Sequence, residues 1–469
     1  MMSKQYDVVI VGAGVAGLKA ASVLAKYDLK IAIIDENPSL GGQYLRTLPE
    51  NFKDRLLKFK TAVKKEGLKL IEGLKNSNVE IIKNSTVIGV YEGDKILFDK
   101  EGRSDLIYYK KLIISTGVRE KYFPFLGWDL PGVFSLGAVQ VFLKSNGVLP
   151  AEEIVLAGTG PFLYAVAYEI LKAGGKVKGI YELKKFKDQI VFSKGLLNFP
   201  AKLVEAFVYL EEILSNNVPI KYGWGVLKAE GDDSVERVFV GKMGQDGRVI
   251  EKSVKSIETE LLAIGFGFVP NLEIARSAGI NIVYNEALGG WVVETDDKLI
   301  TSNENIYASG EITGVGGAEK SQIEGELSAL VLLDSLNLLD NSGKSKIQKL
   351  VKKRKKAIKY SKYFNTVFSV PLEFYKNIED NTVICRCENI SMKKIKEAIE
   401  VGPSDMNFIK TFTRAGMGNC QGRTCGPIIE NIIKSLEGKT PKPATMRKPI
   451  KPTLIGNLKK FYEERIKSS

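Results

Sequence analysis

The chain of 469 residues contains no histidine and only four cysteines. The absence of histidine excludes imidazole as a metal ligand, general base or proton shuttle, so a bound metal needs cysteine or carboxylate ligands. No apolar run approaches the roughly 18 residues that a membrane-spanning helix requires, and the N-terminus enters a strand almost at once. We therefore expect no secretory signal, no membrane span and a reducing, cytoplasmic location in which disulfides are rare.

The formal net charge is +13, and much of it lies in the helix-like segment 344–364. Such a basic run is more often a solvated or subunit-facing surface than a nucleic-acid site, and no recognition module accompanies it. We therefore expect no nucleic-acid partner. Few glutamines and cysteines beside abundant lysine, glutamate and isoleucine are typical of a thermophile.

Segments 6–36 and 153–182 share one pattern, a strand, a glycine-rich turn, a helix and a second strand. Apolar runs such as "VVIV" suit buried parallel strands. Two such units of strand, turn, helix and strand predict an α/β chain with two Rossmann-like dinucleotide-binding domains.

The first glycine-rich turn reads "GAGVAG". Here Gly12 is expected to make the tight turn, Gly14 to admit a pyrophosphate and Gly17 to let the helix approach the strand. Asp35 ends the second strand 23 residues after Gly12, where an acid binds a ribose hydroxyl, and Glu36 can share that role. The segment therefore predicts a bound dinucleotide.

Three further segments, 35–46, 112–120 and 306–317, resemble the elements by which flavoproteins with two dinucleotide domains hold FAD. In that family an acid after the late strand binds the ribityl chain, which implies Glu311 here in place of the commoner Asp. The resemblance also implies these FAD-binding residues: Ala16, Gly42, Gln43, Arg46, Val87, Thr116, Gly117 and Gly310.

The second turn, "GTGPFL", keeps Gly158 and Gly160, followed by Pro161, but has Leu163 where the third glycine is expected. This departure argues against simple NAD(P)H turnover. Glu182 ends the following strand, where it can bind an adenosine ribose and repel a 2′-phosphate. The domain thus either binds NAD or an adenine nucleotide or is empty and structural.

All four cysteines lie near the C-terminal end: Cys385 and Cys387 form C-x-C, and Cys420 and Cys425 form C-x4-C after 32 intervening residues. Four thiolates make a soft site for zinc or an iron-sulfur cluster, and zinc ribbons seldom use C-x-C. The flavin region has no cysteine, which excludes a disulfide reductase. Zinc, a disulfide and free thiols stay as alternatives.

The segment between the cysteine pairs reads as two short helices around "VGPSD", and its layout resembles the 2Fe-2S domain of the bacterioferritin-associated-ferredoxin (BFD) type. Together with "GWDLPGVFSLGAVQ", "TRAGMGNCQGRTCGP" and "RKPIKP", it makes the chain similar to the FAD-containing alpha-type subunit of heteromeric dye-linked dehydrogenases. That group includes proline and hydroxyproline dehydrogenases, opine oxidases, hydrogen cyanide synthase and, more distantly, sarcosine oxidase.

The resemblance implies FAD, a 2Fe-2S cluster, an optional second nucleotide and a hetero-oligomer with an amino-acid-oxidase-like FAD subunit that carries the substrate site. A small ferredoxin-like subunit is a further option. The expected domains are 1–140 with 265–340 for FAD, 141–264 for the second nucleotide, a basic helical linker at 341–380, the 2Fe-2S domain at 381–437 and an extended tail at 438–469.

The predicted function is electron transfer for oxidation of an amino acid or related amine on the partner. The alternatives are a self-sufficient NADH:acceptor oxidoreductase, a scaffold with structural cofactors and a subunit of a polyol-phosphate dehydrogenase. No catalytic base can be assigned. Lys320 and Glu319 are close to the expected flavin but read as surface residues, whereas Arg46 or Arg119 can stabilise a reduced flavin.

Overall fold

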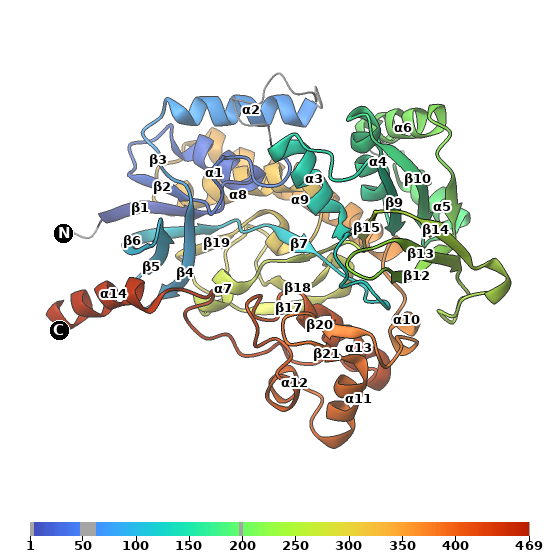
Figure 1. The fold of residues 1–469 in the computed structure, drawn as a ribbon. Coiled ribbons are helices and arrows are strands. Elements are labelled where there is room, and N and C mark those ends of the chain that lie inside the picture. Colours follow the sequence, from blue (N-terminus) through green and yellow to red (C-terminus); the bar gives the residue numbers. More distant parts are fainter. Residues whose placement is uncertain (1–3, 47–61, 197–199, 469) are drawn as a thin grey trace.

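A parallel sheet forms the centre of the first domain. The computed structural model describes residues 4–46, 62–196 and 200–468 (Figure 1). The sheet has the strand order β3-β2-β1-β6, with β19 added beside β6. Its strands are β1 (Lys4–Val11), β2 (Ile31–Ile34), β3 (Glu80–Ile82), β6 (Arg103–Ile114) and β19 (Ile306–Ala308). The apolar runs of β1 and β2 are buried on both faces, as the sequence predicted.

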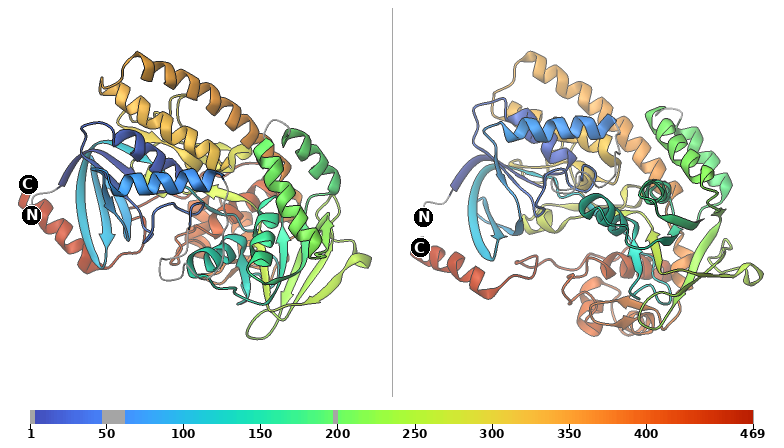
Figure 2. Two further views of the ribbon diagram at one scale, coloured as in Figure 1. Left: turned by 90° about the horizontal axis from the view of Figure 1, so that it is seen from above. Right: turned by 45° about the horizontal axis from the view of Figure 1, so that its top comes forward.

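Helices cover one face of this sheet, and an antiparallel pair extends its edge. Figure 2 shows the helices side by side, α2 against α1, α1 against α8 and α8 against α9. Their bounds are α1 (Val15–Leu24), α2 (Ala62–Lys75), α8 (Gly317–Ser335) and α9 (Asn341–Val367). The edge pair is β4 (Ser85–Tyr91) and β5 (Lys95–Lys100), with β5 antiparallel to both β6 and β4.

The basic segment predicted as a linker is helical, but it is not a linker. Helix α9 packs along α8 and buries Ile347, Leu350 and the side chain of Arg354. Its lysines face solvent, while Ile347 and Leu350 join the core of the first domain. The lysines and the apolar residues therefore lie on different sides of one amphipathic helix.

The second domain repeats the parallel architecture with the strand order β11-β10-β9-β15-β8. Its strands are β8 (Val133–Ser135), β9 (Glu153–Gly158), β10 (Lys176–Glu182), β11 (Ile220–Tyr222) and β15 (Leu261–Gly265). Its helices are α3 (Leu136–Val141), α4 (Phe162–Lys172), α5 (Phe186–Leu196) and α6 (Pro200–Ser215), with a π-helical turn at Phe142–Asn146. A three-stranded antiparallel sheet adds β12 (Trp224–Glu230), β13 (Arg237–Lys242) and β14 (Lys255–Glu258).

Short elements connect the two domains. The strand pair β7 (Val118–Glu120) and β16 (Phe268–Pro270) runs antiparallel, and so does the hairpin β17 (Ile282–Asn285) with β18 (Gly290–Val293). Helix α7 (Glu273–Ser277) contacts β4. These elements hold the carboxyl ends of both parallel sheets near each other.

The cysteine-bearing domain shares a hydrophobic core with the second domain. Its elements are α10 (Leu372–Lys376), β20 (Val383–Cys385), β21 (Ile390–Ser391), α11 (Met392–Val401), α12 (Met406–Thr413) and α13 (Cys425–Glu437). Helices α11 and α12 confirm the two predicted around "VGPSD". Trp128 is fully buried in this core and donates its indole N–H to the Val383 carbonyl at 2.5 Å.

The C-terminal tail is irregular over 438–454 and then forms α14 (Ile455–Ser468). The prediction of an extended tail was therefore wrong for its last part, because Leu458 anchors α14 on Ile88 and Leu97 beside the edge strands. Among the residues described, no helix is long and apolar enough to cross a lipid bilayer.

Candidate cofactor sites

The first glycine loop lies between β1 and α1 and has the geometry that its sequence predicts. Gly12 has φ +104°, and a Cβ there would lie 2.3 Å from the Ser115 carbonyl oxygen. A Cβ on Gly17 would lie 1.9 Å from the Gly12 carbonyl oxygen. Both positions therefore exclude side chains, because backbone atoms cannot yield that much space.

The two acids after β2 have different surroundings. Asp35 is buried, and its carboxylate accepts hydrogen bonds from the backbone N–H of Ala13 at 2.6 Å and of Asn37 at 2.8 Å. Glu36 is exposed at the surface and forms an ion pair with Lys451. Asp35 thus holds the glycine loop in place, and Glu36 presents the accessible carboxylate.

The predicted FAD-binding residues gather around this loop. Ala16 lies against Gly310, where an added Cβ would come within 2.9 Å of the Ala16 Cβ. Gly42 packs on Gly14, since a Cβ on Gly42 would lie 2.9 Å from the Gly14 Cα. Val87 is buried on β4, two residues after Ser85, whose N–H donates to the Asp35 carbonyl at 3.0 Å.

Residues from the connecting strands complete the cradle. Thr116 donates its hydroxyl to the Asn271 carbonyl at 2.7 Å, and Asn271 Nδ2 donates to the Thr116 carbonyl at 2.9 Å. The backbone N–H of Asn271 also donates to Gly117. Sequence reasoning missed Asn271, which directly follows β16. Its role needs the spatial pairing of β7 with β16, which the sequence alone does not reveal.

The open space in this cradle fits FAD. Cβ atoms built on Gly14, Gly117 and Gly317 would meet no atom within 4 Å, so these three backbones border free volume rather than packed core. Glu311 accepts hydrogen bonds from the backbone N–H of Gly317 at 2.8 Å and of Gly316 at 3.1 Å. Burial raises the pKa of Glu311, and the nearby Lys320 opposes that shift. A long ligand bordered by glycines, with a carboxylate at its middle, matches FAD binding in Rossmann-type sites.

Arg46 and Gln43 lie together, with Arg46 Nε donating to Gln43 Oε1 at 2.9 Å. One guanidinium N–H group of Arg46 donates to the hydroxyl of Ser145 in the π-helical turn at 3.1 Å. The pKa of Arg46 is lowered by burial, while Asp35 and Glu36 oppose that shift. Arg46 therefore links the FAD loop to the second domain.

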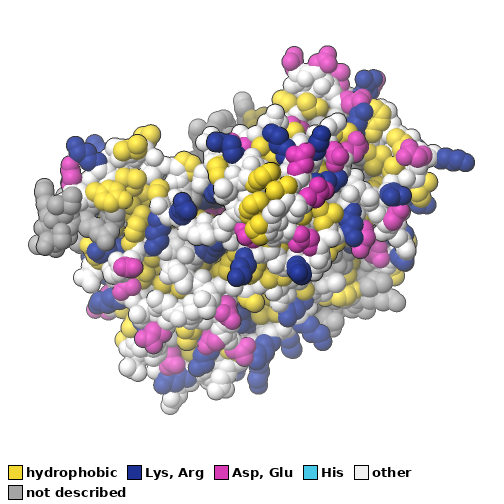
Figure 3. Space-filling view, turned by 90° about the horizontal axis from the view of Figure 1, so that it is seen from below, with side chains coloured by type: hydrophobic (Ala, Val, Ile, Leu, Met, Phe, Trp, Pro, Cys, Tyr) yellow, Lys and Arg dark blue, Asp and Glu magenta, His cyan; other side chains and the backbone are white. Residues whose placement is uncertain are grey.

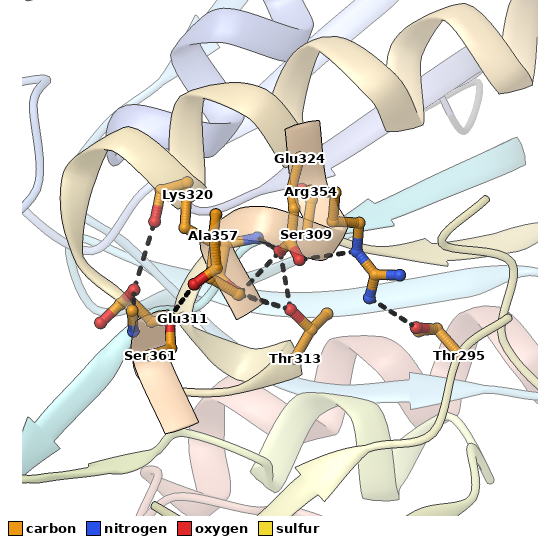
Figure 4. A network of polar contacts seen from close by, with 12 residues as sticks. Thr295, Ser309, Glu311, Thr313, Lys320, Glu324, Arg354, Ala357 and Ser361 are labelled. Atoms are coloured by element: carbon orange, nitrogen blue, oxygen red, sulfur yellow. Dashed lines mark hydrogen bonds and ion pairs between the residues drawn. The ribbon is translucent and has the colours of Figure 1, made fainter. Parts of the chain in front are cut away.

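A buried network of charges underlies the Glu311 turn (Figure 4). Lys320 Nζ donates to the Gly310 carbonyl at 2.8 Å, to the Thr313 hydroxyl at 2.7 Å and to Glu324 at 3.0 Å. The other Glu324 oxygen accepts from Arg354 Nε at 2.9 Å. Burial opposes ionisation of Glu324, but Lys320 and Arg354 outweigh it and lower its pKa.

This network corrects the sequence interpretation of Lys320 as a surface residue. Lys320 is 1% exposed, whereas the neighbouring Glu319 is exposed as expected. One helical turn separates Lys320 from Glu324, so the lysine folds inward onto its partner. Glu324 and Arg354 were not predicted, because a buried ion pair between α8 and α9 leaves no local pattern.

Arg119, considered above as a flavin contact, lies against the cysteine-bearing domain. Its guanidinium donates to the Arg423 carbonyl at 3.1 Å and to Glu273 at 2.9 Å. It also donates to Asn271 at 2.8 Å. Arg119 thus ties the residues that hold Thr116 to the loop between Cys420 and Cys425.

The second glycine loop lies between β9 and α4. Gly158 has φ +145°, and its Cβ would lie 1.9 Å from the Gly265 carbonyl oxygen. Gly160 also has positive φ, +97°, and borders Phe368, followed by Pro161 at the N-cap of α4. Leu163 is fully buried, so α4 packs on the sheet through a side chain instead of a glycine.

Glu182 has a role different from the expected ribose contact. It is 0% exposed and accepts hydrogen bonds from the backbone N–H of Gly160 and of Lys184, both at 2.9 Å. Burial raises the pKa of Glu182 to about 7, against the lowering effect of these hydrogen bonds. Because both oxygens point at the backbone, Glu182 positions the loop.

The four cysteines lie together in two pairs. The thiols of Cys385 and Cys425 are in hydrogen-bonding contact, and so are those of Cys387 and Cys420. No disulfide joins these four. The Cys425 thiol and backbone N–H groups that include that of Gly416 lower the pKa of Cys385 to about 6 against the effect of burial.

This arrangement fits a 2Fe-2S cluster, in which each iron takes two thiolates. Within the described residues, no group of three or more cysteine or acidic side chains is arranged to hold a single metal ion. A structural zinc ion would need all four sulfurs to converge on one point. Cys385 and Cys425 are buried whereas Cys387 is exposed, so one edge of the site faces solvent.

A cavity of about 680 Å³ is lined by residues of both Rossmann-like domains and of the cysteine-bearing domain. Gly160 and Pro161 line one side, and Cys425 and Glu430 line the other. Burial raises the pKa of Glu430 to about 7, and the cations of Arg119 and Arg276 oppose the shift. The second glycine loop and the cysteine loop therefore border the same space.

Comparison with known proteins decides the family. Residues 6–325 match the family described as pyridine nucleotide-disulphide oxidoreductase. The chain belongs to this family. It is an FAD-dependent oxidoreductase, and its residues 383–435 match the BFD-like 2Fe-2S binding domain. The predictions of FAD and of an iron-sulfur cluster instead of zinc are thereby confirmed.

Two relatives of this oxidoreductase span nearly its whole length. An opine oxidase subunit from Agrobacterium tumefaciens (strain Ach5) is 29% identical over 97% of this chain and 92% of its own. Hydrogen cyanide synthase subunit HcnB from Pseudomonas aeruginosa is 31% identical over 92% of this chain and 93% of its own. The resemblance to this group of subunits, drawn from the motifs, is confirmed.

A solved structure confirms the fold class. L-proline dehydrogenase from P. horikoshii superposes with a TM-score of 0.71 at 20% identity, covering 98% of this chain and 80% of that one. At this identity the match speaks to the fold alone. It supports a disulfide-reductase-like arrangement of two Rossmann-like domains with a small helical domain after them.

Proposed function

We propose that this oxidoreductase is the electron-transfer subunit of a heteromeric dye-linked dehydrogenase, with FAD held by the first glycine loop and the cluster by the four cysteines. A partner flavoprotein of amino-acid-oxidase type oxidises the substrate, an amino acid or related amine. The observation that carries the proposal is the presence of both cofactor sites in one chain.

The chemistry of the two groups supports this role. Bound flavin accepts a hydride as an electron pair, whereas a 2Fe-2S cluster passes single electrons, so the protein supplies placement and tuning. Gly14, Gly117 and Glu311 border the FAD cradle, and Arg119 connects its supporting residue Asn271 to the cluster loop. This direct connection suits transfer between the two sites.

The residues beside the FAD cradle support a substrate site elsewhere. Lys320 lies beside the Glu311 turn (Figure 4), and its hydrogen bonds to Gly310, Thr313 and Glu324 use all three donors of its ammonium group. A lysine held in this way cannot turn towards a substrate. Lys320 is therefore not available as a base, which supports a substrate site on a partner.

The names of the relatives support a hetero-oligomer, since both proteins are called subunits. Their names also favour a substrate whose carbon–nitrogen bond is oxidised, such as an opine, proline, hydroxyproline or sarcosine. Exposed large apolar side chains support association as well, because soluble monomers seldom expose them in groups. They lie on one face of α6: Val204, Phe207, Val208 and Leu214.

The cysteine-bearing domain also carries exposed apolar residues. Figure 3 shows the underside of the molecule, where hydrophobic side chains form patches among charged ones. Val401, Phe412 and Met417 are exposed on this domain, and so is the ligand Cys387. A small, partly apolar surface of this kind suits a transient electron-transfer contact.

The experiment is co-expression of the chain with candidate oxidase-like subunits, followed by purification and anaerobic dye reduction. We expect a stable complex with flavin in both subunits, and dye reduction by an amine substrate only in the complex. Substrate-dependent dye reduction by this chain alone would refute the proposal.

The cluster is tested separately by Cys387→Ser. We expect loss of at least about half the bound iron and of the cluster's visible absorption, because one iron loses a thiolate ligand. Ser404→Ala, an exposed hydroxyl in the same domain, is the matched control. Unchanged iron content in the Cys387→Ser chain would exclude this residue as a ligand.

The second candidate is a self-sufficient NADH:acceptor oxidoreductase, favoured by the second Rossmann-like sheet. Buried Leu163 and the inward Glu182 weigh against it, because neither leaves the usual contact for an NADH ribose. Rapid bleaching of the flavin by NADH in the isolated chain would favour it. A polyol-phosphate dehydrogenase subunit is distinguished by dye reduction with a polyol phosphate in the complex.

A further inference from the structure

The tail segment 444–453, here called the C-terminal strap, joins the cysteine-bearing domain to the first domain (Figure 1). At its start, Thr445 and Asn407 exchange two hydrogen bonds, of 2.8 and 3.1 Å. Arg276 donates to the Ala444 carbonyl. At its end, Thr453 donates to Asp99 on β5. The strap is therefore fixed to both parts of the chain.

The middle of the strap touches both cofactor sites through a single residue. The backbone N–H of Ile450 donates to the Ile88 carbonyl at 2.8 Å, next to Val87, which is expected to bind FAD. The Ile450 carbonyl accepts from Arg423 at 2.8 Å. Arg423 lies between two cluster cysteines and also donates to the Cys420 carbonyl at 3.2 Å. Ile450 is 2% exposed, so its own backbone is shielded from solvent.

The next residue of the strap, Lys451, contacts an acid that is expected to bind the ribose of FAD. Lys451 forms an ion pair with Glu36, the accessible acid after β2. Lys448 lies over the ring of Tyr91 at the end of β4, 4.9 Å from its centroid. The strap thus contacts two separate parts of the expected FAD site, the Glu36 turn and the edge strand β4.

We propose that Ile450 and Lys451 are positioning residues that couple the adenosine end of the FAD site to the cluster loop. Lys451 sets the position of Glu36, and Ile450 holds Arg423 and β4 at a fixed separation. Cofactor sites that act together need supports that lock their geometry, and this strap connects them by adjacent residues. The inference rests on the proposed function, because it takes Glu36 and Val87 as FAD contacts.

The expected effect of Lys451 is moderate, because the side chains of Glu36 and Lys451 are 57% and 33% exposed. Exposed ion pairs contribute about 0.2–1 kcal/mol. We therefore expect Lys451→Met to speed FAD release by about two- to fivefold. Lys451→Arg, which keeps the charge, is expected to restore the wild-type rate. Lys459→Met, an exposed lysine paired with Glu463 on α14, is the matched control and is expected to change nothing.

The coupling is tested by hydrogen exchange of the strap in the full chain, with FAD bound and after its removal. Removing FAD is expected to raise exchange at Ile450, and so is Arg423→Gln with FAD still bound. Arg414→Gln, which affects an exposed arginine of the same domain, is the control. Equal exchange in all forms, or equal release of FAD from wild-type and Lys451→Met chains, would overturn the proposal.

Flavin analysis of the wild-type chain comes first, since it tests the cofactor assignment by itself. A chain without bound FAD would overturn the proposed function and this inference with it. A chain that retains FAD but shows no dependence on Lys451 would overturn the inference only.

Discussion

In both glycine loops of this chain, the acid after the second strand fixes the loop by accepting backbone hydrogen bonds. The two loops differ in the residues around that acid. In the first, Asp35 accepts a hydrogen bond from the Ala13 N–H 22 residues earlier and from the Asn37 N–H two residues later. In the second, Glu182 accepts from Gly160 and Lys184 with the same two separations. The acid after the second strand is thus part of the scaffold in both domains.

The difference lies in the residue after that acid. In the first domain it is Glu36, which is exposed, whereas in the second it is Leu183, which is 9% exposed. The helix behind the loop also differs, since Gly17 admits close backbone contact and Leu163 fills the same gap with a side chain. An acid at the end of a second strand therefore does not by itself indicate ribose binding.

Substitutions at the third position of the two glycine loops should have the largest effect on stability and FAD content. Gly17→Leu brings a side chain to within 1.9 Å of the Gly12 carbonyl oxygen, so we expect loss of more than about 4 kcal/mol of unfolding free energy and of nearly all FAD. Leu163→Gly removes a buried side chain and should cost about 3–5 kcal/mol while FAD stays bound. Urea unfolding and flavin content separate the two. Wild-type flavin content in Gly17→Leu would contradict the comparison.

The first domain also depends on its buried ion network. Arg354→Met removes one partner of the fully buried Glu324, so we expect a loss of about 3–5 kcal/mol of unfolding free energy. Lys355→Met, whose exposed partner is Asp297, should change stability by less than about 1 kcal/mol. Equal urea midpoints of the two variants would show that the network does not stabilise the fold.

Gly14→Ala tests whether the first loop borders a ligand rather than packed core. The added Cβ meets no atom within 4 Å and φ is −74°, so the FAD-free chain should lose less than about 1 kcal/mol of unfolding free energy. FAD affinity, measured by flavin fluorescence, should fall by about 100-fold, or roughly 2.7 kcal/mol. Unchanged affinity would place the pyrophosphate elsewhere.

Glu182→Gln should give a smaller effect, visible in the pH dependence of stability. The raised pKa of Glu182, about 7, means that the folded chain holds a proton that the unfolded chain has already released above its ordinary pKa of 4.5. The free energy of unfolding therefore falls as pH rises from 4.5 through 7, by roughly 3 kcal/mol for this group. Glu182→Gln should lack this decline, and identical pH profiles in urea unfolding would refute it.

Most of the cofactor chemistry could be predicted because it depends on local patterns. The spacing of Gly12, Gly14 and Gly17 encodes a turn and a helix start within six residues. The C-x-C and C-x4-C pairs indicate a soft metal site of four thiolates whatever the fold around them, and the family match supports a 2Fe-2S cluster there. The role of Glu182 was not predictable, because exposure is a property of the packed domain.

The sequence by itself determined the two Rossmann-like domains, the FAD and the cluster, since strand periodicity, glycine spacing and thiolate count act over short stretches of chain. Only the tertiary structure decided that Lys320 turns inward to Glu324, that α9 is part of the core, and that Ile450 and Lys451 contact Arg423 and Glu36. These contacts link residues far apart in the chain. The energies of these contacts depend on burial and on the distances between atoms, which are set only when the chain folds.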